Sequence, residues 1–271
     1  MILGVSHITL LSKNIKADGI ELQKLGYLIS FLEENVPNYE GKYDFLAYPS
    51  MNHSLALYRR DNAVPIELIM YEHFTNYGSS CFTAIFEGKV PEEFRGHMNE
   101  EQFMHELTDI FECNLNFFFW DTFETKIGFS GNSARGNGLT ALILFVKDLE
   151  IARMFWENGL GCNPIRSGRT KTGKTWILET FQTLLETWGL NILIVEDNNV
   201  TNSPGLDSVG FNCLSFLTTN LKLDRLRLLN TGAVRSTKEF QLKMNNKNLL
   251  VEIFCGPDAE FIELLQIKSI C

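Results

Sequence analysis

The side chains best suited to chemistry in this 271-residue sequence belong to a histidine, two glutamates and a cysteine, each inside a short apolar segment. The histidine, His7, lies in SHITLL, where strand alternation places it on the same face as Thr9. An imidazole can transfer protons near neutral pH or bind a metal ion. A histidine beside a threonine is consistent with the lining of a cavity, and equally with a hydrogen-bonded histidine in an ordinary sheet.

The two glutamates, Glu67 and Glu263, interrupt the apolar segments IELIM and IELL. A carboxylate in so apolar a strand either points to solvent or is held by a partner, because burying it unpaired is costly. The cysteine, Cys213, lies in FNCLSF and is either a nucleophile or soft ligand, or a small buried thiol. These residue types alone leave a functional and a structural interpretation open.

Residues 168–175, GRTKTGKT, match the phosphate-loop pattern G-x-x-x-x-G-K-[ST] at every defined position. A phosphate loop follows a buried strand and opens a helix, whereas the preceding residues CNPIRS contain a proline and one large aliphatic residue. We therefore predict a basic hairpin turn around Thr172-Gly173-Lys174 and no nucleotide-binding site. The acidic end of NILIVED, which could imitate a second nucleotide-binding motif, keeps nucleotide binding as the alternative.

Composition and charge favour a soluble globular protein, with 45% hydrophobic and 21% charged residues. The net charge of -9 argues against nucleic-acid and membrane partners, since phosphate-rich partners need a basic face. The N-terminus MILGVSHITLLSKN lacks a basic lead and a long apolar block, and no apolar run approaches the roughly 20 residues of a membrane span. The six cysteines form no C-x-x-C pair, which is typical of reduced thiols. We expect a cytoplasmic protein.

A repeated unit organises the chain. Segments that start at Ser6, Thr140 and Phe211 each begin with a strand-like run, continue through a polar N-cap and an amphipathic stretch, and stop at a glycine. The caps are Asn14, Asp148 and Asn220, and the glycines are Gly26, Gly161 and Gly232. Each copy closes with another strand-like run, in VPIELIMYE, LNILIVED and FIELLQIK. The pattern predicts a unit of one strand, one helix and further strands.

We interpret residues 75–137 as one more, degenerate unit, which is the second of four in chain order. Its strands would lie in SCFTAIFEG, NLNFFFWD and TKIGFSG, and its helix in EEQFMHELTDIFE. The glycine-rich segment 128–138 is expected to link two halves of the chain. The segment EDNNVTNSPGLDS is expected to link the third and fourth units.

The C-terminal sequence GPDAEFIELLQ resembles the D-P-x-G-x-x-I-E-L ending of the vicinal oxygen chelate superfamily, and DNAVPIEL resembles it in the first unit. This superfamily includes glyoxalases, bleomycin- and fosfomycin-resistance proteins and extradiol dioxygenases. The resemblance implies an α+β fold of tandem βαβββ modules, arranged as two cup-like halves of curved sheet. We expect modules 1 and degenerate 2 to form the N-terminal half, residues 1–132, and modules 3 and 4 to form the C-terminal half, residues 138–271.

The resemblance also implies where metal ligands would lie, with a histidine on the first strand of a unit and a glutamate on its last strand. Carried over by register, these positions are His7 and Glu67 in the first unit, Thr83 and Lys126 in the degenerate unit, Ala141 and Asn191 in the third, and Cys213 and Glu263 in the fourth. The wider spacing in the first unit implies an insertion within residues 35–52.

If consecutive units pair, the second half should hold no divalent ion, because Ala141 cannot ligate and the neutral Asn191 is a poor ligand. In the first half, an ion would contact His7 and Glu67, which face each other across the cup in this family. Two ligands fall short of the three that catalytic sites usually have. The side chains that could complete the site are His73, His97 and His105.

We therefore expect a small-molecule-binding protein of the glyoxalase or bleomycin-resistance type with an incomplete metal site, which sequesters a compound or acts as a divergent enzyme. Its ligand cavity would be lined by His7, Thr9, Glu67, Cys213 and Glu263. The cofactor is then either none or a divalent metal ion, and no residue is assigned a catalytic role. The alternatives are a metal-dependent lyase, isomerase or ring-cleaving dioxygenase that uses His7 and Glu67, or a pseudo-symmetric interaction scaffold, such as a homodimer.

Overall fold

The computed structural model describes residues 1–73, 80–88, 90, 102–112, 115–121, 124–131, 138–182, 189–200, 205–244 and 247–268. Its α-helices are α1 (Ile15–Lys24), α2 (Gln102–Phe111), α3 (Leu149–Arg153) and α4 (Leu221–Thr231). Helix α3 continues directly into the π-helix η4 (Met154–Leu160), and a short 3-10 helix, η1, spans Glu40–Phe45. The rest of the regular structure is strand.

The strands follow the four predicted units. The first unit holds β1 (Ile2–Leu11), β2 (Leu28–Pro37), β3 (Asn52–Arg59) and β4 (Ile66–Tyr71). The second holds β5 (Phe82–Glu87), β6 (Leu115–Trp120) and β7 (Thr125–Ser130). The third holds β8 (Gly138–Val146), β9 (Asn163–Arg169), β10 (Thr175–Gln182) and β11 (Gly189–Glu196). The fourth holds β12 (Gly210–Thr218), β13 (Arg235–Ser236), β14 (Phe240–Met244), β15 (Lys247–Cys255) and β16 (Phe261–Ile267).

The predicted repeat and the α+β class are confirmed. Asn14 and Asn220 cap α1 and α4, and each side chain accepts a 3.1 Å hydrogen bond from the backbone N–H three residues further on. Asp148 caps α3 by accepting two such bonds of 3.0 Å. The three predicted glycine stops all have positive φ, at Gly26 (+84°), Gly161 (+87°) and Gly232 (+135°).

The pairing of the units differs from the expected one. Strand β1 pairs antiparallel with β12, and β5 pairs antiparallel with β8. The first unit therefore joins the fourth, and the second joins the third, so that the predicted halves, 1–132 and 138–271, each contribute one unit to each curved sheet. Because every unit begins with a similar buried strand, the repeat pattern does not encode which first strands pair.

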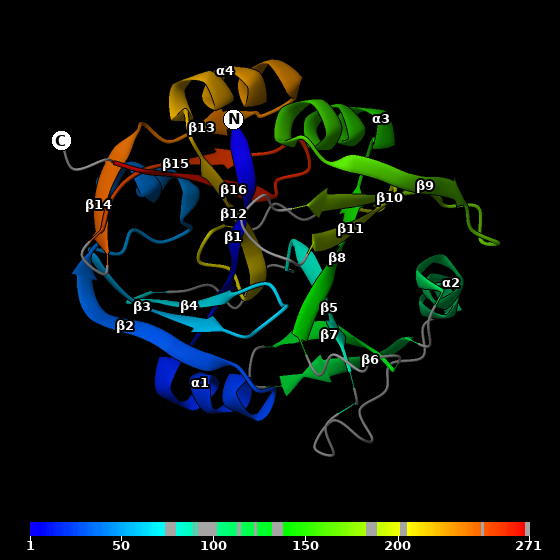
Figure 1. Ribbon diagram of the computed structural model, residues 1–271, viewed down its shortest axis with the longest axis horizontal. Helices are drawn as coiled ribbons and strands as arrows, with labels where there is room; N and C mark the ends of the chain where they lie inside the picture. Colours follow the sequence, from blue (N-terminus) through cyan, green and yellow to red (C-terminus); the bar gives the residue numbers. More distant parts are fainter. Residues whose placement is uncertain are drawn as a thin grey trace.

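The strands form one continuous sheet with two curved parts, which lie side by side (Figure 1) and are treated below as two sheets. The first, called the β1/β12 sheet, has the order β2-β3-β4-β1-β12-β16-β15-β14, and the short β13 also pairs with β15. The second, the β5/β8 sheet, has the order β6-β7-β5-β8-β11-β10-β9. A pair between Phe211 and Phe82 joins β12 to β5. Register shifts at three points along β1 mark the irregularities at which such a sheet bends.

Three loop predictions can be compared with the structure. Residues 170–174 form a hairpin turn between β9 and β10, closed by a 2.8 Å bond from Thr170 N–H to the Lys174 carbonyl, so the predicted hairpin is confirmed. The predicted linker 128–138 begins too early, because β7 continues to Ser130 in register with β5. The predicted insertion is confirmed: residues 38–51, including η1, separate β2 from β3, whereas β14 ends only three residues before β15 begins.

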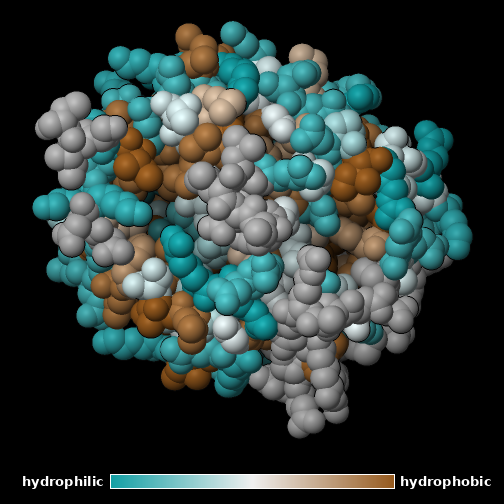
Figure 2. Space-filling model, in the orientation of Figure 1, coloured by the Kyte–Doolittle hydropathy of each residue, from teal (hydrophilic) through white to brown (hydrophobic). Residues whose placement is uncertain are grey.

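The face of the molecule shown in Figure 2 is mainly hydrophilic, with apolar side chains in separate patches. No helix among the described residues is long and apolar enough to cross a membrane.

Candidate functional site

A buried histidine lies between two carboxylates on the β1/β12 sheet. His7 Nε2 is 3.6 Å from Glu67 Oε2 and 3.6 Å from Glu263 Oε2. The side chains of His7, Glu67 and Glu263 are only 9%, 10% and 12% exposed. On its other side, the ring approaches the Ser6 hydroxyl, with Nδ1 3.1 Å from Oγ. The predicted approach of His7 and Glu67 is confirmed, and Glu263 joins them because the fourth unit, not the second, completes this sheet.

A pseudo-twofold axis between β1 and β12 relates the two halves of the cluster. His7 lies opposite Ser215, and Thr9 lies opposite Cys213. The Thr9 hydroxyl donates a 3.1 Å hydrogen bond to Glu67, and the equivalent Ser215 hydroxyl donates a 2.7 Å bond to Glu263. His7 therefore occupies in the first unit the position that Cys213 occupies in the fourth. Each carboxylate is oriented by its own hydroxyl, and both face one imidazole.

The charged groups of the cluster stabilise one another's charged forms. Burial alone would lower the pKa of His7, but the carboxylate of Glu67 and then that of Glu263 outweigh burial and raise it above its usual value. Burial would raise the pKa of Glu67, but the positive charges of His7 and Lys42 and the Thr9 hydroxyl lower it. The arrangement favours an imidazolium ion between the two carboxyl groups.

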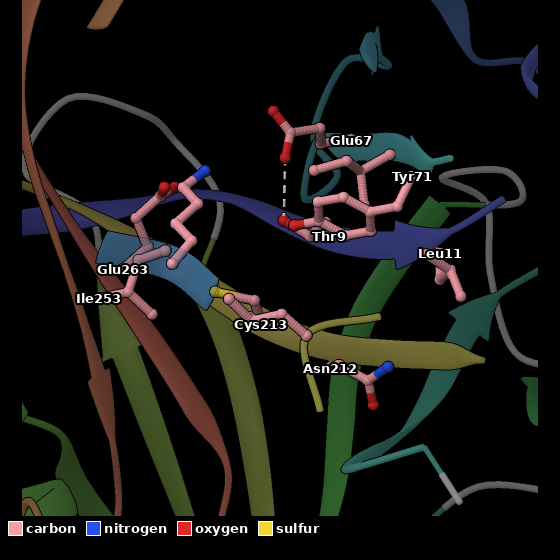
Figure 3. Close-up of a pocket in the computed structure, with 11 residues that line it drawn as sticks. Thr9, Leu11, Glu67, Tyr71, Asn212, Cys213, Ile253 and Glu263 are labelled. Carbon is pink, nitrogen blue, oxygen red and sulfur yellow. Dashed lines mark hydrogen bonds between the residues drawn. The ribbon is translucent and has the colours of Figure 1, made fainter. Parts of the chain in front are cut away.

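A small, partly open cavity of about 20 Å³ lies beside this cluster. Glu67 and Thr9 lie on one side of it, Glu263 on the other and Cys213 between them (Figure 3). The wall also carries two polar residues that the sequence did not indicate, Lys42 and Asn212. The remaining lining residues are Leu11, Ile69, Tyr71, Leu206 and Ile253. A few polar groups thus converge within an otherwise apolar wall, which is typical of a small-molecule site.

Cys213 is held as a neutral thiol. Burial, followed by the charges of Glu263 and Glu67, raises the pKa of the Cys213 thiol well above its usual value. A thiol needs deprotonation to act as a nucleophile or metal ligand. Cys213 therefore contributes a small, uncharged side chain to the wall of the cavity.

Lys42 reaches the cavity from η1, in the inserted segment, and is 7% exposed. The segment is fixed on both sides. The Tyr39 ring stacks on Phe240 with ring centroids 4.4 Å apart, and the backbone N–H groups of Ala47 and Tyr48 donate bonds of 2.8 and 3.1 Å to the Asp207 carboxylate. No sequence pattern distinguishes this lysine, because its position depends on the path of the insertion.

The structure places the predicted site residues as follows. Thr9, Glu67, Cys213 and Glu263 line the cavity, and His7 contacts both carboxylates. His73 is exposed beyond the end of β4 and does not contribute. His97 and the side chain of His105 lie outside the described residues. Ser215, which sequence reasoning missed, could have been found by applying the repeat register to Thr9.

The β5/β8 sheet has no comparable cluster among the described residues. Its positions equivalent to those of the β1/β12 cluster follow from strand pairing, and they are Thr83, Gly128, Ala141 and Leu193. Lys126 and Asn191 were the predicted positions, and both are wrong by two residues. A two-residue slip keeps a side chain on the same face of a strand, so alternation could not reveal it. Ala141 and Leu193 pack in an apolar cluster with Ile85 and Phe117.

A divalent ion, which the family resemblance implies, does not fit the observed donors well. His7 Nε2 is buried without a hydrogen-bond partner and faces two carboxylate oxygens, which favours an ion. However, no three His, Cys, Asp or Glu side chains of the described residues converge closely enough to hold one. The thiol is protonated, and the Lys42 ammonium adds positive charge to the same cavity. The side chains present suit a protonated histidine better than a metal.

No family model and no curated protein sequence matches the chain. Its structure is similar to glyoxalase I from Zea mays, with a TM-score of 0.63 at 12% identity over 97% of this chain and 92% of that chain. It is also similar to a protein from Bacillus subtilis assigned as a dioxygenase, with a TM-score of 0.59 at 11% identity over 99% and 86% of the two chains. The chain therefore has the fold of the vicinal oxygen chelate superfamily.

Proposed function

We propose that the cavity of the β1/β12 sheet binds a small polar molecule, and that it does so without a metal ion. The observation that carries this proposal is the convergence of Thr9, Lys42, Glu67 and Glu263 on one cavity within an apolar wall. Burying this many ionisable groups is unfavourable unless they are paired, so their presence favours function over stability.

The side chains define what such a ligand would offer. The carboxylates of Glu67 and Glu263 accept hydrogen bonds, so they suit hydroxyl or amine groups. Lys42 donates only, so it suits a carbonyl or anionic oxygen. The imidazolium of His7 lies between the carboxylates and can exchange a proton with either one, which would serve a divergent enzyme as well as a binding protein.

A library of small polar molecules screened by thermal unfolding, in chelator-treated buffer, tests the proposal. Compounds that raise the unfolding temperature should bind one per chain in calorimetry. Glu67→Gln should weaken them at least about tenfold, because it removes a charged acceptor. Thr83→Val, at the position equivalent to His7 in the β5/β8 sheet, is the matched control and should leave binding unchanged. Hits that bind Glu67→Gln as tightly as the wild type would place the site elsewhere.

The second candidate is a metal-dependent lyase, isomerase or ring-cleaving dioxygenase that holds its ion with His7 and Glu67. The unpartnered His7 Nε2 favours it. Elemental analysis of protein purified without chelator separates the two candidates. One equivalent of a divalent metal that is lost in His7→Ala would favour this second candidate.

A further inference from the structure

Lys42 is the only lysine or arginine that is buried among the described residues. Its ammonium contacts the face of the Phe240 ring, with Nζ 5.2 Å from the ring centroid. No hydrogen bond or ion pair joins Nζ to another residue in the described part of the chain. A buried ammonium without a close carboxylate is costly, so the groups around the cavity must compensate it at longer range.

The field of Lys42 reaches three strands around the cavity. It lowers the pKa of Glu67 on β4 and opposes the rise in the pKa of Cys213 on β12. On β3, burial and then the charge of Lys42 lower the pKa of His53 to about 4, so this ring is neutral. Two cations, His7 and Lys42, thus oppose two carboxyl groups, Glu67 and Glu263.

The position of Lys42 is built into the fold. Besides the stacking of Tyr39 on Phe240, the Phe45 ring meets Phe261 edge-on at 5.7 Å, and the Phe45 carbonyl accepts a 2.8 Å bond from Leu206 N–H. The fourth unit has only a short connection between β14 and β15, so Lys42 has no pseudo-symmetric counterpart. One cation therefore enters an otherwise twofold arrangement.

We propose that Lys42 is the resident cation of this cavity: its ammonium compensates the carboxylates and keeps a divalent ion from binding to His7, Glu67 and Glu263. A divalent ion held by His7, Glu67 and Glu263 would share the cavity with the fixed positive charge of Lys42, which opposes its binding. The inference shares its cavity with the proposed function but is tested by zinc binding and not by ligand binding, so either can fail without the other.

Zinc titration of the metal-free chain by calorimetry tests this role. The wild type should show no zinc site that depends on His7. Lys42→Met should gain one site per chain, tighter than any wild-type binding by on the order of 100-fold, because a unit charge opposing a divalent ion is removed. His7→Ala in the Lys42→Met background should remove that site. Lys42→Arg keeps the charge and should gain nothing.

Cooperative thermal unfolding shows whether each variant is folded, and Lys42→Gln replaces Lys42→Met if the latter is not. A folded Lys42→Met or Lys42→Gln protein without a new zinc site would overturn the inference. So would a zinc site in the wild type that His7→Ala abolishes, a result that needs no Lys42 variant. If no compound of the library binds the wild type, but Lys42→Met gains the zinc site, the proposed function is refuted and the inference about Lys42 stands.

Discussion

At four equivalent positions, one curved sheet carries mainly ionisable side chains and the other carries none. The β1/β12 sheet has a histidine, a cysteine and two glutamates there, whereas the β5/β8 sheet has a threonine, a glycine, an alanine and a leucine. The glycine, Gly128, leaves space that Phe117 and Ile85 fill, since a Cβ there would lie 2.5 Å from Ile85 Cδ1.

The difference teaches that the fold itself does not require the polar cluster. The β5/β8 sheet reaches the same strand arrangement with a closed apolar cluster, which is the cheaper way to fill a concave face. The ionisable groups of the β1/β12 sheet are therefore best explained by what they bind. Substitutions in both sheets test or sharpen this contrast.

The largest effect is expected from placing a carboxylate in the apolar sheet. Leu193 is equivalent to Glu263 and has no exposed surface. Leu193→Glu should lower the free energy of unfolding by about 4 kcal/mol or more, because no cation is available to pair with the buried charge. Urea denaturation followed by tryptophan fluorescence measures it. Leu193→Met is the control and should cost less than about 1.5 kcal/mol; equal losses in the two variants would mean that packing, not charge, distinguishes the sheets.

The next effect concerns the cation of the polar cluster. His7→Gln leaves Glu67 and Glu263 facing each other without the imidazolium, and should lower the free energy of unfolding at pH 7 by about 3 kcal/mol. Adding Glu67→Gln should restore part of this loss, because the repulsion is relieved. A double-mutant cycle in urea gives the coupling. Strictly additive losses would show that the 3.6 Å approach of His7 to Glu67 contributes nothing to stability.

The local features of this architecture could be predicted from the sequence. The caps Asn14, Asp148 and Asn220 and the hairpin at residues 170–174 depend on interactions between near neighbours, and these were predictable. The alternation that places His7 and Thr9 on one face is equally local. Which units pair is decided by packing between strands over two hundred residues apart, such as His7 and Ser215. The place of Lys42 in the cavity could not be predicted for the same reason, because the inserted segment is positioned by the distant residues Phe240 and Asp207.

A buried carboxyl group on β10, a strand of the β5/β8 sheet, gives a further test by pH. Glu179 on β10 has no exposed surface, and burial, followed by the charge of Glu157, raises its pKa from 4.5 to about 8. The folded state keeps the proton where the unfolded state has lost it. Stability should therefore fall as pH rises from about 4.5 to about 8 and level off above.

Glu179→Gln removes this titration, so its stability relative to the wild type should rise across that window by about 5 kcal/mol. Because only the change with pH is compared, a constant effect of the amide cancels. Urea midpoints at half-unit pH intervals provide the measurement. A parallel pH dependence of the two proteins would show that Glu179 ionises normally.

The smallest effects are expected at the two hydroxyls that orient the carboxylates. Ser215→Ala and Thr9→Val each remove one hydrogen bond to a glutamate and should lower the free energy of unfolding by about 1 kcal/mol. The loss should be greater for Ser215→Ala, whose bond to Glu263 is 2.7 Å long, than for Thr9→Val, whose bond to Glu67 is 3.1 Å long. Thr83→Val in the β5/β8 sheet is the matched control and should change stability by less than about 0.5 kcal/mol. If Thr83→Val were as costly as the other two, the hydroxyls would be ordinary parts of a strand, and the contrast between the sheets would reduce to the histidine and the carboxylates.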